Sequence, residues 1–121
     1  MTLTLTGEPK STQHIYKFAC RGPFPKMYMT KEGKEIKEAY QWEAMAQVQR
    51  APHRLRGKEL HVTLHFYFGT KRKCDLDNFN KLALDALTGI VWEDDSQIAK
   101  LTLVKDYDKA NPRIEVTVGV V

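Results

Sequence analysis

Residues 60–68, LHVTLHFYF, alternate without a break between two sets of side chains. Leucine, valine and phenylalanine occupy the even positions, and histidine, threonine and tyrosine occupy the odd ones. Successive side chains of a strand point to opposite faces, so this segment predicts a β-strand with one buried face. His61 and His65 would lie about 13 Å apart along that strand, too far to share one ion. We interpret them as partly exposed residues of its polar face.

The segments around this strand predict the rest of the fold. Upstream, we expect a strand over 14–20, then a loop over 21–25 and a helix over 30–50 that Pro52 ends. Residues 1–13 either add a short strand or stay loose. Downstream, we expect a helix over 78–88 that Gly89 stops, then strands over 97–105 and 113–121 paired as a hairpin. This order predicts an α+β fold, in which a mixed four-stranded sheet carries two helices on one face.

Composition indicates one domain of 1–121, because 121 residues with 42% hydrophobic side chains suffice for a single modest core. Cys20 and Cys74 are far apart and form neither a zinc-binding pair nor a disulfide framework, which favours a reducing compartment. No apolar run approaches the length of a membrane span, and residues 1–13 lack the features of a secretory signal. We therefore expect a cytoplasmic protein.

Acidic residues gather in one window of a chain whose net charge is +4. Residues 75–98 contain one lysine, Lys81, and six carboxylates, so this window has a net charge of −5 and the other 97 residues have +9. Clustered carboxylates repel one another unless they share a cation, and Mg²⁺ prefers such oxygen ligands. A metal-ready acidic centre in a basic protein points to chemistry on a polyanion such as nucleic acid. The six acids are Asp75, Asp77, Asp85, Glu93, Asp94 and Asp95.

The acidic residues also have structural interpretations. On extended backbone, Asp75 and Asp77 would project to one side about 6 to 7 Å apart and could reach one ion. Asp77 could instead cap the following helix. Residues 93–96 could fold back beside the first pair, or they could form an acidic turn between strands. On the exposed face of that helix, Lys81 could act on a phosphate or form an ion pair with Asp85.

Two basic segments are candidates for contacts with DNA phosphates, although such runs also occur as solvated loops. The segment close to the acidic window has the candidate residues Lys71, Arg72 and Lys73. The segment further away has Arg54, Arg56 and Lys58. Phe24, Tyr28 and Trp92 could stack on bases or form a dimer contact, but in a small domain they are more often core residues.

Several motifs together resemble the signature of the RusA family of Holliday junction resolvases. They are DLDNFNK (75–81), DAL (85–87) and WEDDSQI (92–98), preceded by KRK (71–73). Their spacing also agrees, and the resemblance is sharp over about residues 60–105. One departure lies in the segment PFPK (23–26), which keeps the prolines of a family turn but lacks its asparagine.

The resemblance implies a small homodimeric, Mg²⁺-dependent endonuclease, with Mn²⁺ as a substitute, that nicks branched DNA and is often encoded by phages. It implies that Asp75, Asp77 and Asp95 bind the metal and that Lys81 is needed for cleavage, with Asp94 beside the site. Asp85 and Asn78 are further candidate neighbours of that set. A twofold dimer could place one site on each of two opposing junction strands and nick both. Two alternatives stay open: a metal nuclease of flaps or forks, and a basic DNA-binding module without catalysis. Neither a small-molecule cofactor nor a membrane partner is expected.

Overall fold

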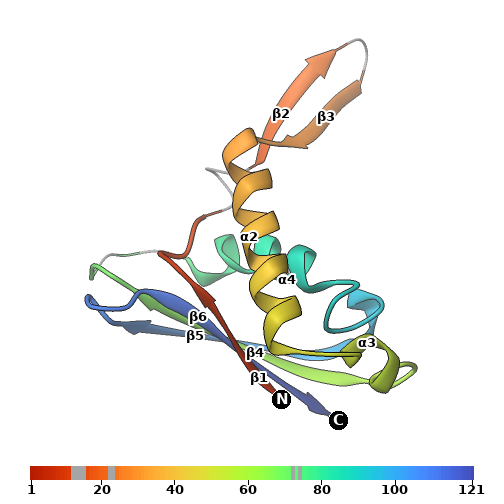
Figure 1. The fold of residues 1–121 in the computed structure, drawn as a ribbon. Helices are drawn as coiled ribbons and strands as arrows, with labels where there is room; N and C mark the ends of the chain where they lie inside the picture. The colour runs from red at the N-terminus through yellow and green to blue at the C-terminus, as the bar shows by residue number, and fades with distance from the viewer. Residues whose placement is uncertain (12–15, 22–23, 72, 74) are drawn as a thin grey trace.

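The computed structural model describes residues 1–11, 16–21, 24–71, 73 and 75–121. They form a four-stranded mixed sheet, a separate two-stranded sheet and three α-helices. Figure 1 shows helices α2 and α4 on the same side of the larger sheet, with α3 at one end of it. The α+β class and the mixed four-stranded sheet are therefore confirmed, with one more helix than expected.

The larger sheet is built around β4 (Leu60–Phe68), whose residues alternate between buried and half-buried as the sequence predicts. The strand order is β1-β6-β4-β5, with β1 (Thr2–Thr6), β5 (Ile98–Tyr107) and β6 (Arg113–Val120). β5 runs parallel to β4, whereas β6 is antiparallel to β4 and to β1. β4 and β6 are thus the inner strands, and β5 forms one edge of the sheet.

The predicted hairpin of the last two strands is wrong, because β4 lies between β5 and β6. The connection after β5 passes the end of β4, where the Asp108 amide donates to the Phe68 carbonyl at 2.9 Å. β4 has an uninterrupted buried face. Placing β5 and β6 on its two edges buries more apolar surface than pairing β5 with β6 on one edge would. Alternation predicted these strands, but it carries no information about which strands are neighbours.

The first predicted strand is also placed differently. β2 (Tyr16–Arg21) pairs with β3 (Phe24–Met29) in the separate two-stranded sheet, so much of the predicted loop over 21–25 is strand. Figure 1 shows this pair beyond the beginning of α2, away from the larger sheet. The edge position in the larger sheet is taken by β1, the optional strand of residues 1–13. Pro23, in the turn that lacks the family asparagine, lies outside the described residues.

Helix α2 (Lys31–Gln47) confirms the first predicted helix, and the Thr30 hydroxyl caps it by accepting the Gly33 amide at 3.1 Å. Pro52 does not end this helix. The chain leaves the helical conformation at Val48, adopts a left-handed conformation at Arg50 (φ 56°), and begins the short helix α3 (Ala51–Arg54) with Pro52 in its first turn. Proline is well tolerated there because its missing N–H would have no partner within the helix.

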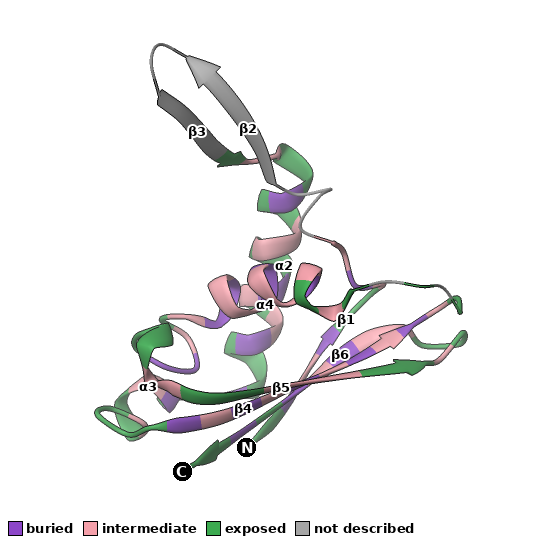
Figure 2. Cartoon of the chain, turned by 180° about the vertical axis from the view of Figure 1, so that it is seen from behind, coloured by how far each residue is buried: buried purple, intermediate pink, exposed green. Residues whose placement is uncertain are grey.

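The core lies between the sheet and the two longer helices. Figure 2 shows buried segments along β4 and β6 and on the inner faces of α2 and α4 (Asn80–Leu87), whereas β5 is largely half-buried or exposed. Trp92 is fully buried, so it belongs to the core rather than to a binding surface. No helix of the described segments has the length and apolarity needed to cross a bilayer.

Candidate functional site

The first acidic pair lies at the beginning of the second predicted helix, which is split into the short 3₁₀ helix η1 (Leu76–Asn78) and α4. Asp75 precedes η1, Asp77 lies within it, and both residues are exposed. The capping interpretation of Asp77 is wrong: the cap position of α4 is Phe79, and no side chain hydrogen-bonds there. Helix capping therefore does not account for either carboxylate.

Phe79 fixes the position of this pair. Its ring packs edge-on against Phe66 and Phe68, with centroid distances of 6.2 and 5.1 Å. Since both partners lie in the last part of β4, the start of α4 is held over that end of the sheet. η1 also contacts β5. Asp75 and Asp77 consequently lie beside the last part of the two parallel strands.

The second acidic group, residues 93–96, begins just after the buried Trp92 and forms a tight turn. The carboxylate of Asp94 accepts the Ser96 amide at 3.2 Å and caps the 3₁₀ helix η2 (Asp95–Gln97). Gln97 completes a capping box, and its Nε2 donates to the Leu55 carbonyl at 2.8 Å. Asp94 thus shapes the turn, as the acidic-turn interpretation predicts, while Asp95 stays exposed at the start of η2.

The electrostatics of this turn indicate an excess of negative charge. Hydrogen bonds from the Ser96 amide and from Asp95 lower the pKa of Asp94, which keeps that carboxylate ionised. The hydrogen bond with Asp94 raises the pKa of Asp95, and the negative charges of Asp94 and Asp85 add to this effect. Asp95 therefore holds a proton more tightly than an isolated aspartate does. A divalent cation would relieve the same repulsion, so this donor set fits a metal ion chemically.

Lys81 lies in α4, between the two acidic groups in the sequence. Its Nζ lies 3.1 Å from Oδ2 of Asp85, so the predicted ion pair is present. Both side chains remain accessible, at 41% and 34% exposure, so water screens the pair. The ion pair and a role in catalysis are compatible, because a weak exposed pair can exchange partners.

The described residues do not contain a complete metal centre: no three histidine, cysteine, aspartate or glutamate side chains among them are grouped to hold an ion. Asp85 and Asp94 act electrostatically on Asp95, and Asp75 and Asp77 lie at the start of the second predicted helix. That Asp75, Asp77 and Asp95 share a metal stays a prediction, as do the neighbouring roles of Asn78, Asp85 and Asp94.

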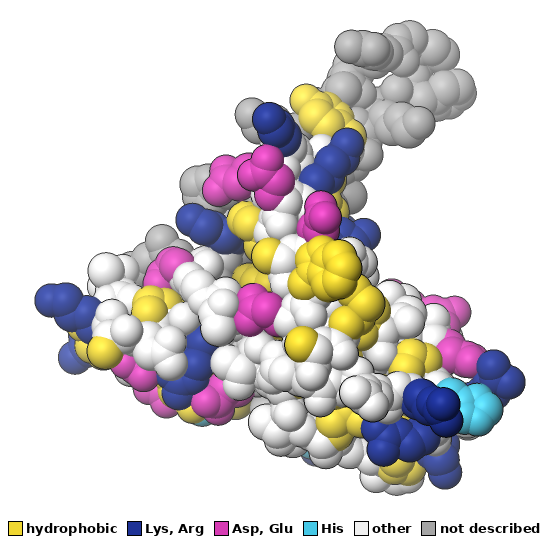
Figure 3. Space-filling model, viewed as in Figure 1, with side chains coloured by type: hydrophobic (Ala, Val, Ile, Leu, Met, Phe, Trp, Pro, Cys, Tyr) yellow, Lys and Arg dark blue, Asp and Glu magenta, His cyan; other side chains and the backbone are white. Residues whose placement is uncertain are grey.

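Each acidic group has a basic segment near it. Arg56 Nε donates to Glu93 Oε1 at 2.7 Å, so the segment over 54–58 adjoins the second group rather than lying apart from the acidic window. Arg54 donates to the Gln49 carbonyl at 2.8 Å, and Lys58 is exposed. Figure 3 shows Lys and Arg side chains gathered at separate ends of the sheet layer.

The other basic segment leads from β4 to η1. Lys71 and Lys73 are exposed, and Arg72 lies outside the described residues. Lys71 Nζ lies 5.6 Å from the ring centroid of Tyr107, which is not among the functional residues predicted from the sequence. The alternation of β5 could have indicated it, since a tyrosine and Lys105 occupy the same face two residues apart.

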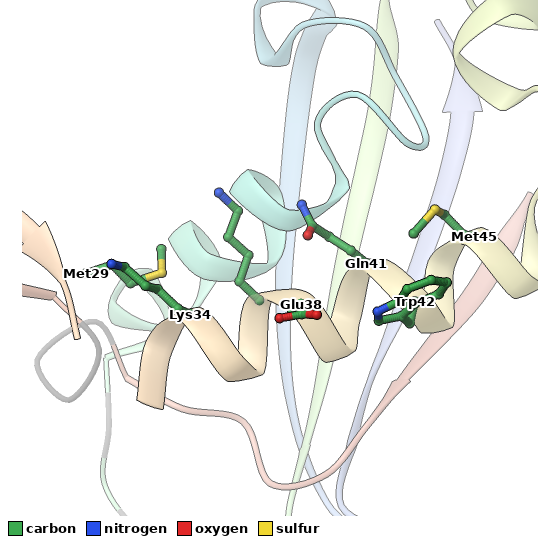
Figure 4. Close-up of a pocket in the computed structure, with 7 residues that line it drawn as sticks. Met29, Lys34, Glu38, Gln41, Trp42 and Met45 are labelled. Carbon is green, nitrogen blue, oxygen red and sulfur yellow. The ribbon is translucent and has the colours of Figure 1, made fainter. Parts of the chain in front are cut away.

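Hollows lined by described residues also lie away from the acidic turn. One, of about 310 Å³, is lined by Thr70, Lys71, Lys105, Asp106 and Tyr107. Another, of about 620 Å³, follows the exposed side of α2, where Figure 4 shows Trp42 and Met45 along the helix beyond Glu38 and Gln41. Among the described residues that line this second hollow, Glu38 is the one carboxylate, so the hollow is unsuited to hold a metal ion.

Comparison with known protein families agrees with the motifs. The family model for Endodeoxyribonuclease RusA matches residues 6–119, a range that includes both acidic groups, Lys81 and both basic segments. A comparison with individual curated proteins gave no match. Because the family model matches nearly the whole chain, the protein belongs to the RusA endodeoxyribonuclease family.

Proposed function

We propose that the protein is a Mg²⁺-dependent endodeoxyribonuclease that resolves Holliday junctions by paired, symmetric nicks during recombination and repair. Family membership is the observation that carries this proposal, because RusA proteins are endodeoxyribonucleases that act on branched DNA junctions and generally use divalent metal ions. Mg²⁺ is the preferred ion in the proposal, and Mn²⁺ is its expected substitute. We place the activity in the cytoplasm, as the sequence predicts.

Asp75, Asp77 and Asp95 are the proposed metal ligands. Carboxylate oxygens suit a hard divalent cation, and the raised pKa of Asp95 supports a local need for positive charge. When bound, such an ion polarises the scissile phosphate and lowers the pKa of the attacking water. Asp94 contributes by holding the η2 turn, because its hydrogen bond to the Ser96 amide fixes the backbone from which Asp95 projects.

Lys81 is proposed to stabilise the negative charge that develops on the phosphate. Its ion pair with Asp85 is an exposed i, i+4 pair, and such pairs contribute only about 0.3–0.5 kcal/mol. A phosphate that approaches α4 can therefore draw the ammonium group away from Asp85 at little cost. A cation positioned at developing charge lowers the barrier more than it strengthens substrate binding.

A homodimer is part of the proposal, since a four-way junction has two opposing strands to nick and a twofold dimer offers two equivalent sites. The basic segments would contact the DNA backbone, which gives affinity without reading sequence. Their residues are Lys71, Arg72, Lys73, Arg54, Arg56 and Lys58.

The deciding experiment adds Mg²⁺ to the protein with labelled junction, fork, flap and linear duplex DNA in parallel. We expect paired nicks with 5′-phosphate ends on the junction, no cleavage of duplex, and loss of cleavage by Asp77→Asn with junction binding retained. Preferential cutting of flaps or forks would show that these structures, rather than four-way junctions, are the substrate. Equal cleavage by wild type and Asp77→Asn would contradict the site, and binding without any cleavage would indicate a DNA-binding module.

A further inference from the structure

We propose that Tyr107, Lys71 and Lys105 form a nucleotide-binding subsite, in which the tyrosine stacks on an unpaired DNA base and the two lysines contact the flanking phosphates. This inference rests on the proposed function and extends it, because it names residues that would hold the branch point beside the acidic site.

The three side chains line one hollow at the end of the β4 and β5 strands, of about 310 Å³. Tyr107 is 41% exposed, although it lies in a strand, and Lys71 Nζ is 5.6 Å from its ring centroid. An accessible aromatic ring with two ammonium groups is the combination that binds single-stranded nucleic acid, where bases stack and phosphates pair with lysine. The hollow thus has both chemical parts of a nucleotide site.

The register of the sheet places this subsite next to the first acidic pair. Lys105 is opposite Phe66 and Tyr107 is opposite Phe68, so both project on the helix side of β5. Phe79 packs on the same two phenylalanines, and it follows directly on η1, which contacts β5. The segment that carries Asp75 and Asp77 therefore runs beside the subsite on the same face of the sheet.

The alternate residues of β5 have a different role. On the other face, Thr102 and Asp106 contact His61 and His65 at 2.9 and 3.1 Å. Asp106 also lines the hollow, but its carboxylate is occupied by His65 and by the Tyr107 amide at 2.8 Å. Pairs of that kind occupy the polar residues of the opposite face, whereas the ring of Tyr107 stays 41% exposed beside the Lys71 ammonium group.

The contact between Lys71 and Tyr107 does not block a base. A cation–π contact at an exposed site contributes only about 0.5–1 kcal/mol, whereas stacking of a base on an aromatic side chain contributes about 1–3 kcal/mol. An incoming base can therefore displace Lys71 from the ring, and the released ammonium group can then contact a neighbouring phosphate. The ring and the lysine both gain a stronger partner.

The test measures binding of the full-length protein to a four-way junction without metal, so that the result does not depend on cleavage. Tyr107→Leu should weaken binding about fivefold to 100-fold, and it should lose the quenching of a 2-aminopurine base at the branch point. Tyr107→Phe keeps the ring and should retain both. The slope of log Kd against log salt should be unchanged in both tyrosine variants, because neither alters a charge.

Lysine variants test the phosphate contacts separately. Lys105→Gln should reduce the salt slope by about 1, whereas Lys100→Gln, on the same strand but opposite His61, should leave it unchanged. The subsite would be overturned if Tyr107→Leu kept wild-type affinity and quenching, or if the leucine and phenylalanine variants lost the same affinity. Equal salt slopes for the two lysine variants would overturn it as well. Failure of the wild type to bind junctions or to cleave them with Mg²⁺ would instead overturn the proposed function.

Discussion

Lys81 offers a sharp test because two different substitutions remove the same ion pair. Lys81→Gln removes its cation, and Asp85→Asn removes its anion. The pair is exposed and spans one helical turn, so its loss should lower the free energy of unfolding by only about 0.3–0.5 kcal/mol in either variant. Urea unfolding of both variants measures this change, and the two curves should nearly coincide.

Cleavage should separate the two variants. If Lys81 stabilises charge on the scissile phosphate, Lys81→Gln should slow single-turnover junction cleavage by about 10²- to 10³-fold, the usual effect of losing one such contact. Asp85→Asn keeps the lysine and should stay within a few-fold of wild type, and junction affinity should change little in both. Equal loss of rate in the two variants, or a drop in unfolding free energy above about 2 kcal/mol for Lys81→Gln, would refute this reasoning and make Lys81 a structural residue.

Three further predictions concern the framework that holds the site. Phe79→Ala should lower the unfolding free energy by about 3–5 kcal/mol, since Phe79 is 5% exposed and packs on two β4 phenylalanines; a loss below about 1 kcal/mol in urea would show that it does not anchor α4. Thr30→Ala should cost about 1 kcal/mol through the lost α2 cap, with Thr30→Ser close to wild type in thermal melts. The hydrogen bond from Arg113 lowers the pKa of Asp108 from 3.8, so the pair stabilises the fold above that pH and stops doing so as acid protonates the folded carboxylate. Asp108→Asn should therefore have a lower free energy of unfolding than wild type at neutral pH, and that free energy should fall less in acid. Parallel profiles of unfolding free energy against pH for the two proteins would contradict this.

The candidate site shows how far residue patterns reach. The motifs identified the acids, Lys81 and the ion pair with Asp85, because these depend on residue type and on spacing within one helix. The sequence predicted an acidic turn over 93–96, but only the structure shows that Asp94 holds this turn, since that depends on the hydrogen bonds within it. Tyr107 was missed for a similar reason: Lys71 meets it only after the two parallel strands align their ends.

The sequence by itself determined the β4 strand to the residue and the family to which the chain belongs, because periodicity and motif spacing are local properties. Only the tertiary structure decided that β4 separates β5 from β6, that β1 takes the sheet edge, and that β2 and β3 pair by themselves. Alternation specifies which face of a strand is buried, but the neighbours of a strand depend on which of several pairings buries the most apolar surface once the helices are in place.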